Sequence, residues 1–252
     1  MGDTDVIRRI PGDLLRRVEP LSIHVHRFPR PSVSGLMFAL IVFDLDGTLV
    51  DSKRDIADSA NALLVACGAE PLAEDRLAGM VGDGAATLVA RAFEAAGLAR
   101  PSDALARYLA FYETRLLAHT RPYPGVVDVL DDLQSKAKLA VLTNKPLAAT
   151  RAVLEGLGLA RYFEVGAVIG GDGPFPRKPD ATALRYLMSS AGVSPDATLH
   201  VGDSVIDCRT ARAARTSLCL ARYGFGFVGF PTGELNAADH LIDAPADLLR
   251  LI

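Results

Sequence analysis

The sequence has no tryptophan, only three cysteines and no long uninterrupted hydrophobic run, and most of these absences exclude a class of protein. Cys67, Cys208 and Cys219 are odd in number and far apart, which argues against a disulfide framework and favours reduced, buried thiols in a cytoplasmic protein. Five histidines are present, but no Cys/His set has the spacing of a zinc site. No apolar run reaches the ~20 residues that a membrane-spanning helix needs. The absence of tryptophan excludes nothing.

An excess of positive charge is also absent. The chain has 27 Lys and Arg against 30 Asp and Glu, a formal net charge of -3 at pH 7. This balance argues against a general polyanion binder, so we expect neither nucleic acid nor a membrane surface as a partner. The length of 252 residues, half of them hydrophobic, suits one large domain or a core with an inserted lobe. The oligomeric state does not follow from these features.

The first 36 residues differ in composition from the rest of the chain. They mix Arg, Pro and Ser without sustained periodicity. Frequent Arg is typical of a transit peptide, but four acidic residues between positions 3 and 19 are unfavourable for one, and no apolar segment precedes a cleavage site. We therefore interpret residues 1–36 as a disordered tail or a misassigned start, with translation beginning at Met37.

From residue 38 onward, short apolar runs alternate with amphipathic helical segments. Such runs are typical of strands buried on both faces of a parallel sheet, and they cover residues 38–44, 138–144, 165–171, 198–204 and 216–222. Helical periodicity separates them at residues 126–137 and 181–192, where Gly192 is the expected C-terminal cap. The alternation predicts an α/β fold with a doubly wound, Rossmann-like parallel sheet and right-handed crossovers.

A long helical insertion interrupts this pattern between the first and second strands. Residues 52–120 contain three amphipathic segments, whose apolar positions begin at Ile56, Leu88 and Leu105. The prolines within residues 121–126 cannot continue a helix, so this stretch is interpreted as the return to the core. The predicted organisation is an N-terminal extension at 1–36, an α/β core at 37–51 and 121–252, and an all-helical cap at 52–120.

Polar and charged side chains gather where the predicted strands end, which is where ligands bind in an open α/β sheet. These residues are Asp44 and Asp46 after the first strand, Thr143 and Asn144 after the second, Lys178 in the next loop, and Asp203, Ser204 and Asp207 after the fourth. Clustered carboxylates indicate a hard cation with oxygen ligands, for which we expect Mg²⁺. Asp44 and Asp46 lie two apart on a strand and can face one centre, where one binds metal and the other transfers protons.

The order of these motifs resembles that of the haloacid dehalogenase superfamily of phosphohydrolases. DLDGTLVDS, the threonine ending the second strand, RKPD and GDSVID appear in the family order over about residues 38–252. The helical insertion resembles the helical cap of that superfamily. YPGV, LTNKP and VGDGAATLVARAF most resemble the phosphoglycolate phosphatases within it. The resemblance implies a Mg²⁺-dependent phosphomonoesterase for a small phosphorylated metabolite, with 2-phosphoglycolate, hydrolysed to glycolate and phosphate, as the first expectation.

The resemblance also implies what the three principal aspartates do. Asp44 would attack phosphorus and carry an aspartyl-phosphate, which divides hydrolysis into two easier steps. Asp46 would protonate the leaving alkoxide and then take a proton from the hydrolytic water. Asp44, Asp203 and the backbone carbonyl of Asp46 would hold Mg²⁺.

The remaining predicted site residues surround this centre. By the same resemblance, Thr143 and Asn144 would donate hydrogen bonds to the transferring phosphoryl group. Lys178 would hold the nucleophile and the phosphate by charge. Ser204 and Asp207 would orient the contacts or the water around the metal, although Asp207 is also an ordinary first-turn aspartate of a helix.

Two loops near the predicted site carry expectations of their own. Because proline favours the first helical turn, Pro179 predicts a helix that opens directly beside Lys178. The glycine loop at residues 80–89 either closes over the substrate and excludes water or is an ordinary helix N-terminus.

Other functions remain open for the same set of residues. The same core and cap also serve sugar-phosphate phosphatases, β-phosphoglucomutases, nucleotidases and pyrophosphatases, and a mutase would return the phosphate to a sugar. A binding module on an inactive phosphatase scaffold belongs to another class, and the full set of catalytic residue types argues against it. Residues 1–36 could also recruit a membrane or a partner.

Overall fold

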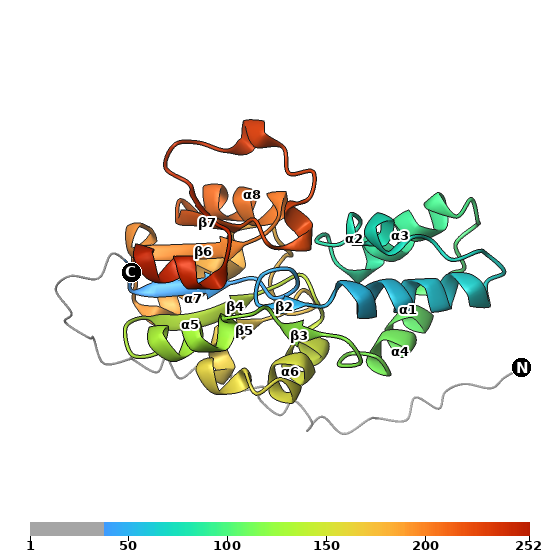
Figure 1. Cartoon of the computed structure of the whole chain (residues 1–252), viewed down its shortest axis with the longest axis horizontal. Helices are drawn as coiled ribbons and strands as arrows, with labels where there is room; N and C mark the ends of the chain where they lie inside the picture. The colour runs from blue at the N-terminus through green and yellow to red at the C-terminus, as the bar shows by residue number, and fades with distance from the viewer. Residues whose placement is uncertain (1–37) are drawn as a thin grey trace, which may run out of the picture.

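The computed structural model describes residues 38–252, and its centre is a six-stranded sheet with the order β5-β4-β1-β6-β7-β8 (Figure 1). All neighbouring strands run parallel. The strands are β1 (Leu40–Phe43), β4 (Lys138–Leu142), β5 (Val168–Ile169), β6 (Thr198–Gly202), β7 (Ser217–Ala221) and β8 (His240–Ile242). Every residue of β1 is buried, as its continuous apolar run predicts for a central parallel strand. The interpretations of residues 1–36 lie outside the described residues.

The five predicted runs each contain a strand, but two details of the sheet differ from the expectation. Residues 165–171 form a 3₁₀ turn at Val165–Ala167 followed by only two strand residues in β5. Strand β8, at the edge of the sheet, has no counterpart in the prediction. It has three residues, of which only Ile242 is buried, so it carries no apolar run that a sequence pattern could detect.

Helices cover both faces of the sheet. Successive side chains of a strand alternate between faces, so Ile41 and Phe43 belong to one hydrophobic cluster and Leu40 and Val42 to another. The first face is covered by α5 (Val126–Leu133), α6 (Leu147–Gly156) and the C-terminal 3₁₀ helix Pro245–Leu251, and the second by α7 (Thr182–Ala191) and α8 (Val205–Ala214). This arrangement confirms the predicted doubly wound α/β fold.

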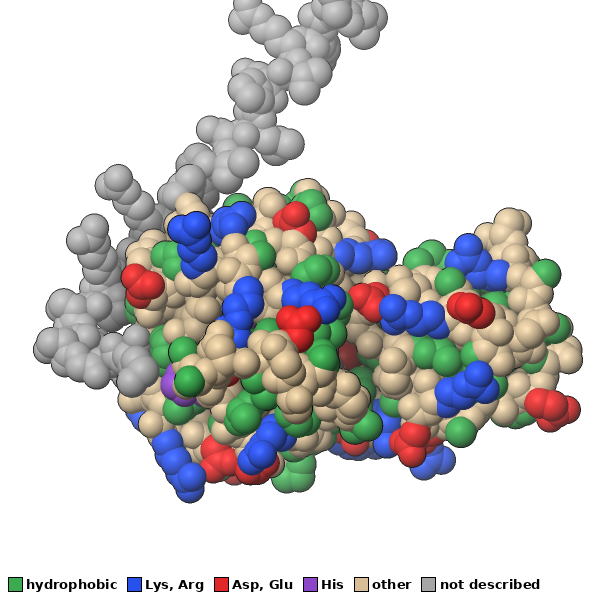
Figure 2. All heavy atoms as spheres, turned by 90° about the horizontal axis from the view of Figure 1, so that it is seen from above, with side chains coloured by type: hydrophobic (Ala, Val, Ile, Leu, Met, Phe, Trp, Pro, Cys, Tyr) green, Lys and Arg blue, Asp and Glu red, His purple; other side chains and the backbone are tan. Residues whose placement is uncertain are grey.

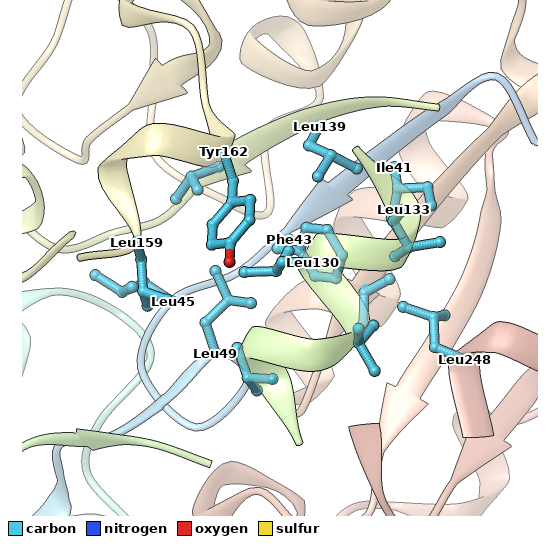
Figure 3. Packing of buried hydrophobic residues seen from close by; sticks show 14 of the residues in the cluster. Ile41, Phe43, Leu45, Leu49, Leu130, Leu133, Leu139, Leu159, Tyr162 and Leu248 are labelled. Atoms are coloured by element: carbon cyan, nitrogen blue, oxygen red, sulfur yellow. The ribbon is translucent and has the colours of Figure 1, made fainter. Parts of the chain in front are cut away.

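Figure 3 shows how the first face is packed. Leu130 and Leu133 of α5 are completely buried and lie against Phe43 and Ile41 of the central strand. Full burial of such a side chain contributes roughly 1.5–3 kcal/mol. The central strand is therefore held rigidly, and so is the position at which its chain continues into Asp44.

Four helices outside the sheet layers form a lobe with a hydrophobic cluster of its own (Figure 1). They are α1 (Lys53–Ala66), α2 (Glu74–Ala78), α3 (Ala85–Ala95) and α4 (Ala104–Glu113). The three predicted amphipathic segments correspond to α1, α3 and α4, whose apolar faces meet inside the lobe. Helix α2 has five residues, too few for a helical period to be visible in the sequence.

A short antiparallel ribbon joins the lobe to the sheet. Strand β2 (Val50–Asp51) pairs with β3 (Arg121–Pro122), so both chain crossings lie side by side. The buried carboxylate of Asp55, at the start of α1, accepts hydrogen bonds from the backbone N–H groups of His119 and Thr120 and from the Thr120 hydroxyl, at 2.7–3.0 Å. The two crossings are thereby fastened to each other.

The state of the cysteines and the length and polarity of the helices can be compared with what the sequence predicts. All three cysteines are free, with Cys208 and Cys219 buried and Cys67 partly exposed. Across residues 38–252, the helices are too short or too polar to traverse a lipid bilayer. The face seen in Figure 2 carries basic and acidic side chains intermixed.

Candidate active site

Six of the eight residues predicted at the strand ends line a cleft of about 640 Å³, including its open mouth, between the sheet and the lobe, and the other two, Lys178 and Asp207, are buried beside it. In Figure 2 the molecule narrows at the junction of these two bodies. The core lines the cleft with Asp44, Asp46, Thr143, Asn144, Lys145, Asp203 and Ser204, and the lobe with Ile56, Val81, Leu88, Tyr108 and Tyr112, among others. The side of the cleft that faces the sheet is therefore polar, and the side that faces the lobe is largely apolar.

Lys178 connects two of the predicted acids. Its Nζ lies 2.9 Å from Asp44 Oδ1 and 2.6 Å from Asp207 Oδ1. All three side chains are almost completely buried, and His200 Nε2 lies 3.2 Å from the same oxygen of Asp207. Buried charges are screened little by solvent, so Lys178 is held firmly between the two carboxylates.

The crowding of carboxylates perturbs their pKa values. Burial raises the pKa of Asp44 to about 6, against the opposing effect of Lys178 and with a further contribution from Asp207. Burial, reinforced by Asp207 and Asp44, raises the pKa of Asp203 well above its usual range. One buried ammonium group does not offset three buried carboxylates, which is the condition that a bound cation relieves.

Asp207 forms an ion pair with Lys178 and also caps its own helix. Burial acts to raise its pKa, but Lys178 and His200 outweigh burial and hold the pKa below its usual range. Its Oδ2 accepts hydrogen bonds from the backbone N–H and the hydroxyl of Ser204, in a capping box that begins α8. Both oxygens of Asp207 are therefore engaged by protein donors.

Asp44 and Asp203 have the properties of metal ligands. One oxygen each of Asp44, Asp203 and Asp207 lies within 4.8 Å of the other two. Asp44 Oδ1 is buried, and apart from the Lys178 ammonium at 2.9 Å, which is poorly aligned for a hydrogen bond, it has no donor beside it among the described residues. Asp203 accepts one hydrogen bond, from the Gly226 N–H at 2.7 Å. Hard carboxylate oxygens with unsatisfied lone pairs fit a small divalent cation such as Mg²⁺.

Three glycines leave the space that the Asp203 carboxylate occupies. A Cβ on Gly47 would lie 1.8 Å from Asp203 Oδ2, and one on Gly224 or Gly226 would lie 2.5 or 2.8 Å from it. Gly47 also has φ +88°, a conformation that side-chain-bearing residues rarely adopt. The loop at residues 223–230 thus supplies two of the three glycines around this carboxylate.

Asp46 faces a lysine that the sequence analysis missed. Its carboxylate accepts a hydrogen bond from Ser52 Oγ at 2.6 Å and lies 3.0 and 3.1 Å from Lys145 Nζ. Lys145 also contacts the Tyr112 hydroxyl of α4. The available signal was the position of Lys145 in the strand-end loop that already contained Thr143, but a lysine next to a proline in a loop is usually solvated.

Asn144 fastens the Lys178 loop instead of facing the cleft with free donors. Its amide donates to the carbonyl oxygens of Gly82 and Lys178 at 2.8 and 2.9 Å, and its Oδ1 accepts from the Lys178 N–H at 2.8 Å. Both amide hydrogens are therefore used, so this geometry does not support the prediction that the Asn144 side chain donates to a phosphoryl group. Thr143 differs, because its Oγ1 accepts from the Lys145 N–H at 3.2 Å and keeps its own hydrogen for a ligand.

The helix expected directly beside Lys178 is not there. The Lys178–Pro179 peptide bond is cis, and α7 begins only at Thr182. The expectation was wrong because Pro179 belongs to a turn, in which the Asp180 N–H bonds the Arg177 carbonyl at 3.0 Å. Lys178 is nevertheless buried near the cleft, because Asn144 holds its backbone on both sides.

The glycine loop at residues 80–89 is a helix N-terminus that also borders the cleft, and its closure over a substrate stays a prediction. Gly84 precedes the first turn of α3, so the loop is a helix N-terminus. Val81, Gly82 and Gly84 also line the cleft, and the Gly82 carbonyl accepts the hydrogen bond from Asn144. The loop is thus one of the contacts by which the lobe touches the core.

Comparisons with known proteins point to one family of hydrolases. A family model described as haloacid dehalogenase-like hydrolase matches residues 41–221. A phosphoglycolate phosphatase of Rhodospirillum rubrum is 45% identical over 194 residues, covering 73% of this chain and 80% of that protein. One of Agrobacterium fabrum is 39% identical over 210 residues, covering 81% and 88%. The crystal structure of a predicted phosphoglycolate phosphatase from Haemophilus somnus superposes with a TM-score of 0.80 at 30% identity, covering 86% of this chain and 99% of that one.

Proposed function

The chain belongs to the haloacid dehalogenase-like hydrolase family, and from this premise we propose that it is a Mg²⁺-dependent phosphomonoesterase that hydrolyses 2-phosphoglycolate to glycolate and phosphate. The observation that carries the proposal is the buried carboxylate of Asp44. It faces the cleft without an aligned hydrogen-bond donor, with Lys178 at 2.9 Å. A carboxylate that is withdrawn from solvent in a cleft and held beside a lysine is suited to act as a nucleophile.

In the proposed first step, an oxygen of Asp44 attacks phosphorus and the bond from phosphorus to the ester oxygen breaks. Asp46 gives its proton to the leaving alkoxide, which departs as the hydroxyl group of glycolate. Asp46 then takes a proton from water, and the water oxygen attacks the aspartyl-phosphate. Phosphate leaves, and the carboxylate of Asp44 is regenerated. The separation of the two aspartates by one residue places both in the cleft.

The other core residues support these steps through charge and position. Lys178 and the Thr143 hydroxyl would stabilise the negative charge of the transferring phosphoryl group. Asp207 would hold the Lys178 ammonium from the side opposite Asp44, and Ser204 would hold Asp207 through the capping box. Asn144 would position the Lys178 loop, which replaces the predicted donation from its side chain.

Asp44, Asp203 and the backbone carbonyl of Asp46 would hold Mg²⁺, which when bound offsets the repulsion between the anionic nucleophile and the anionic phosphoryl group. The unsatisfied oxygen of Asp44 and the raised pKa of Asp203 support a cation at this point. Asp203 keeps its place because three glycines leave room for its carboxylate.

We propose that the lobe formed by α1–α4 is a cap that excludes water from the cleft. It supplies the apolar lining, and exclusion of water strengthens the electrostatic interactions inside. The relatives named phosphoglycolate phosphatases support the substrate, and the three free cysteines support a cytoplasmic location. A related capped phosphotransferase remains the second candidate, and a panel of phosphorylated metabolites compared by kcat/KM separates the two.

The proposal is tested by phosphate release from 2-phosphoglycolate with Mg²⁺. Asp44→Asn keeps the shape of the side chain but removes the nucleophile, so we expect kcat to fall by at least roughly 10³-fold. Asp58→Asn makes the same change on the exposed face of α1 and should leave kcat unchanged. Hydrolysis that survives Asp44→Asn, or no hydrolysis of any phosphate ester by the wild-type protein, would overturn the proposal.

A further inference from the structure

Among the described residues, the charged side chains that line the cleft all come from the core. Four of its lining residues within the described part of the chain are charged, namely Asp44, Asp46, Lys145 and Asp203. Lys145 is the one cation among them. Lys178 pairs with Asp44 but does not line the cleft, whereas Lys145 does.

Lys145 is buried at the point where the core meets the lobe. The residue is 6% exposed, and its backbone N–H is fixed by Thr143 Oγ1. Its Nζ lies 4.5 Å from the centre of the Tyr112 ring of α4 and contacts the hydroxyl of that tyrosine. The aromatic ring and the hydroxyl thus hold the ammonium at the boundary between the core and the lobe.

A bound phosphate monoester has to place its two ends at different parts of this cleft. Its phosphoryl group belongs at Asp44, so its remaining part extends toward the residues of the lobe. There the lining is mostly apolar, and Lys145 is the cation that a second negative group would meet. A buried ammonium needs a charged partner, and its partner within the protein is Asp46, which the proposed reaction needs for proton transfer.

We propose that Lys145, together with the Tyr112 hydroxyl, binds an anionic group at the non-phosphorylated end of the substrate and exchanges its contact with Asp46 for that group. The inference rests on the proposed phosphomonoesterase function and specifies its substrate class as small phosphate esters with a second negative charge. A carboxylate one carbon from the ester oxygen belongs to this class. An ester without a second negative group leaves the Lys145–Asp46 ion pair intact, so Lys145 does not contribute to its binding.

The experiment compares 2-phosphoglycolate with ethyl phosphate, which has the same phosphate and two-carbon chain but no carboxylate. For Lys145→Met we expect kcat/KM toward 2-phosphoglycolate to fall on the order of 10²-fold or more, mainly through KM, and toward ethyl phosphate by less than about 10-fold. Lys145→Arg keeps the charge and should retain part of the preference. Lys136→Met removes an exposed lysine and should change neither value.

A second measurement does not depend on the folding of a variant. Glycolate, which carries the carboxylate, should inhibit the wild-type enzyme competitively in the hydrolysis of ethyl phosphate, and ethanol at the same concentration should not. Circular dichroism melting establishes that Lys145→Met is folded before its kinetics are compared.

The failures of the two proposals are distinguishable. Equal losses for both esters in Lys145→Met mean that Lys145 only positions Asp46, and this result overturns the inference. Wild-type turnover of both esters without preference, or no inhibition by glycolate, also overturns it while phosphatase activity stands. A wild-type protein that hydrolyses neither ester with Mg²⁺ overturns the proposed function itself.

Discussion

Single residues in the cleft are constrained by how closely carboxylates approach the backbone. Asp203 lies against Gly47, Gly224 and Gly226, and the carboxylate of Asp207 lies against Gly202, where a Cβ would be 2.1 Å from its Cγ. Each glycine therefore has a packing reason that is local to one acidic side chain. In the sequence these glycines are indistinguishable from the glycines of ordinary turns.

Gly47→Ala tests this packing. The added Cβ overlaps Asp203 Oδ2, and φ +88° is unfavourable for alanine, so we expect kcat/KM to fall at least about 10²-fold and the free energy of unfolding to fall by about 1–3 kcal/mol. Steady-state kinetics and urea denaturation measure the two effects.

Gly68→Ala is the matched control for Gly47→Ala. Gly68 has φ +85° and nothing within 4 Å of the position of a Cβ. The substitution should therefore cost the backbone strain alone and leave kcat/KM near the wild-type value. Equal losses of activity in the two variants would contradict the packing argument at Asp203.

Among the elements, the ribbon of β2 and β3 and the start of α1 decide how the lobe is attached. Sequence patterns located three helices of the lobe and the proline-containing return segment, because amphipathic periodicity and proline act locally. The clamp between Asp55 and Thr120 was not predicted. The two residues are 65 positions apart, and an acidic residue in a first helical turn ordinarily indicates only an interaction with the helix dipole.

Asp55→Asn should weaken this attachment. The amide places a donor opposite the N–H groups of His119 and Thr120, so we expect a loss of about 2–4 kcal/mol in the free energy of unfolding and faster amide exchange at these two residues. Urea denaturation and hydrogen exchange measure the two effects. Asp128→Asn makes the same change in the first turn of α5 at an exposed position and should cost less than about 1 kcal/mol. A similar cost in both variants would show that Asp55 acts only on its helix.

Because the acidic cluster is buried, the free energy of unfolding of the whole molecule should depend on pH. The pKa of Asp44 rises from 3.8 to about 6 in the folded protein, mainly through burial. Without metal, the folded state thus binds this proton more tightly than the unfolded chain. The resulting stabilisation is complete below about pH 4 and is lost as the pH rises through about 6. Asp203 acts in the same direction, whereas Asp207, whose pKa is lowered, loses its stabilising effect only under more acidic conditions.

Asp44→Asn isolates this contribution. In EDTA at pH 7–8 the variant should be more stable than the wild-type protein by about 1–2 kcal/mol, and the difference should shrink toward zero as the pH falls from 6 to 4. Urea denaturation at several pH values measures it, with Asp58→Asn as the control that shows no such trend. A difference that grows toward acidic pH would contradict the burial of an uncompensated carboxylate at Asp44.

The sequence by itself determined the doubly wound sheet, the helical insertion and the residue types at the strand ends. Apolar runs, helical periodicity and the order of short motifs are local properties of a chain, so they can be recognised in the sequence alone. Only the tertiary structure decided which charges meet, since Lys145 and Asp46 are 99 residues apart and Lys145 and Tyr112 are 33 apart. It also placed Asn144 on the Lys178 loop and left Asp44 without an aligned donor. The physical reason is that contacts between distant segments depend on the packing of the whole chain, for which no local pattern is a substitute.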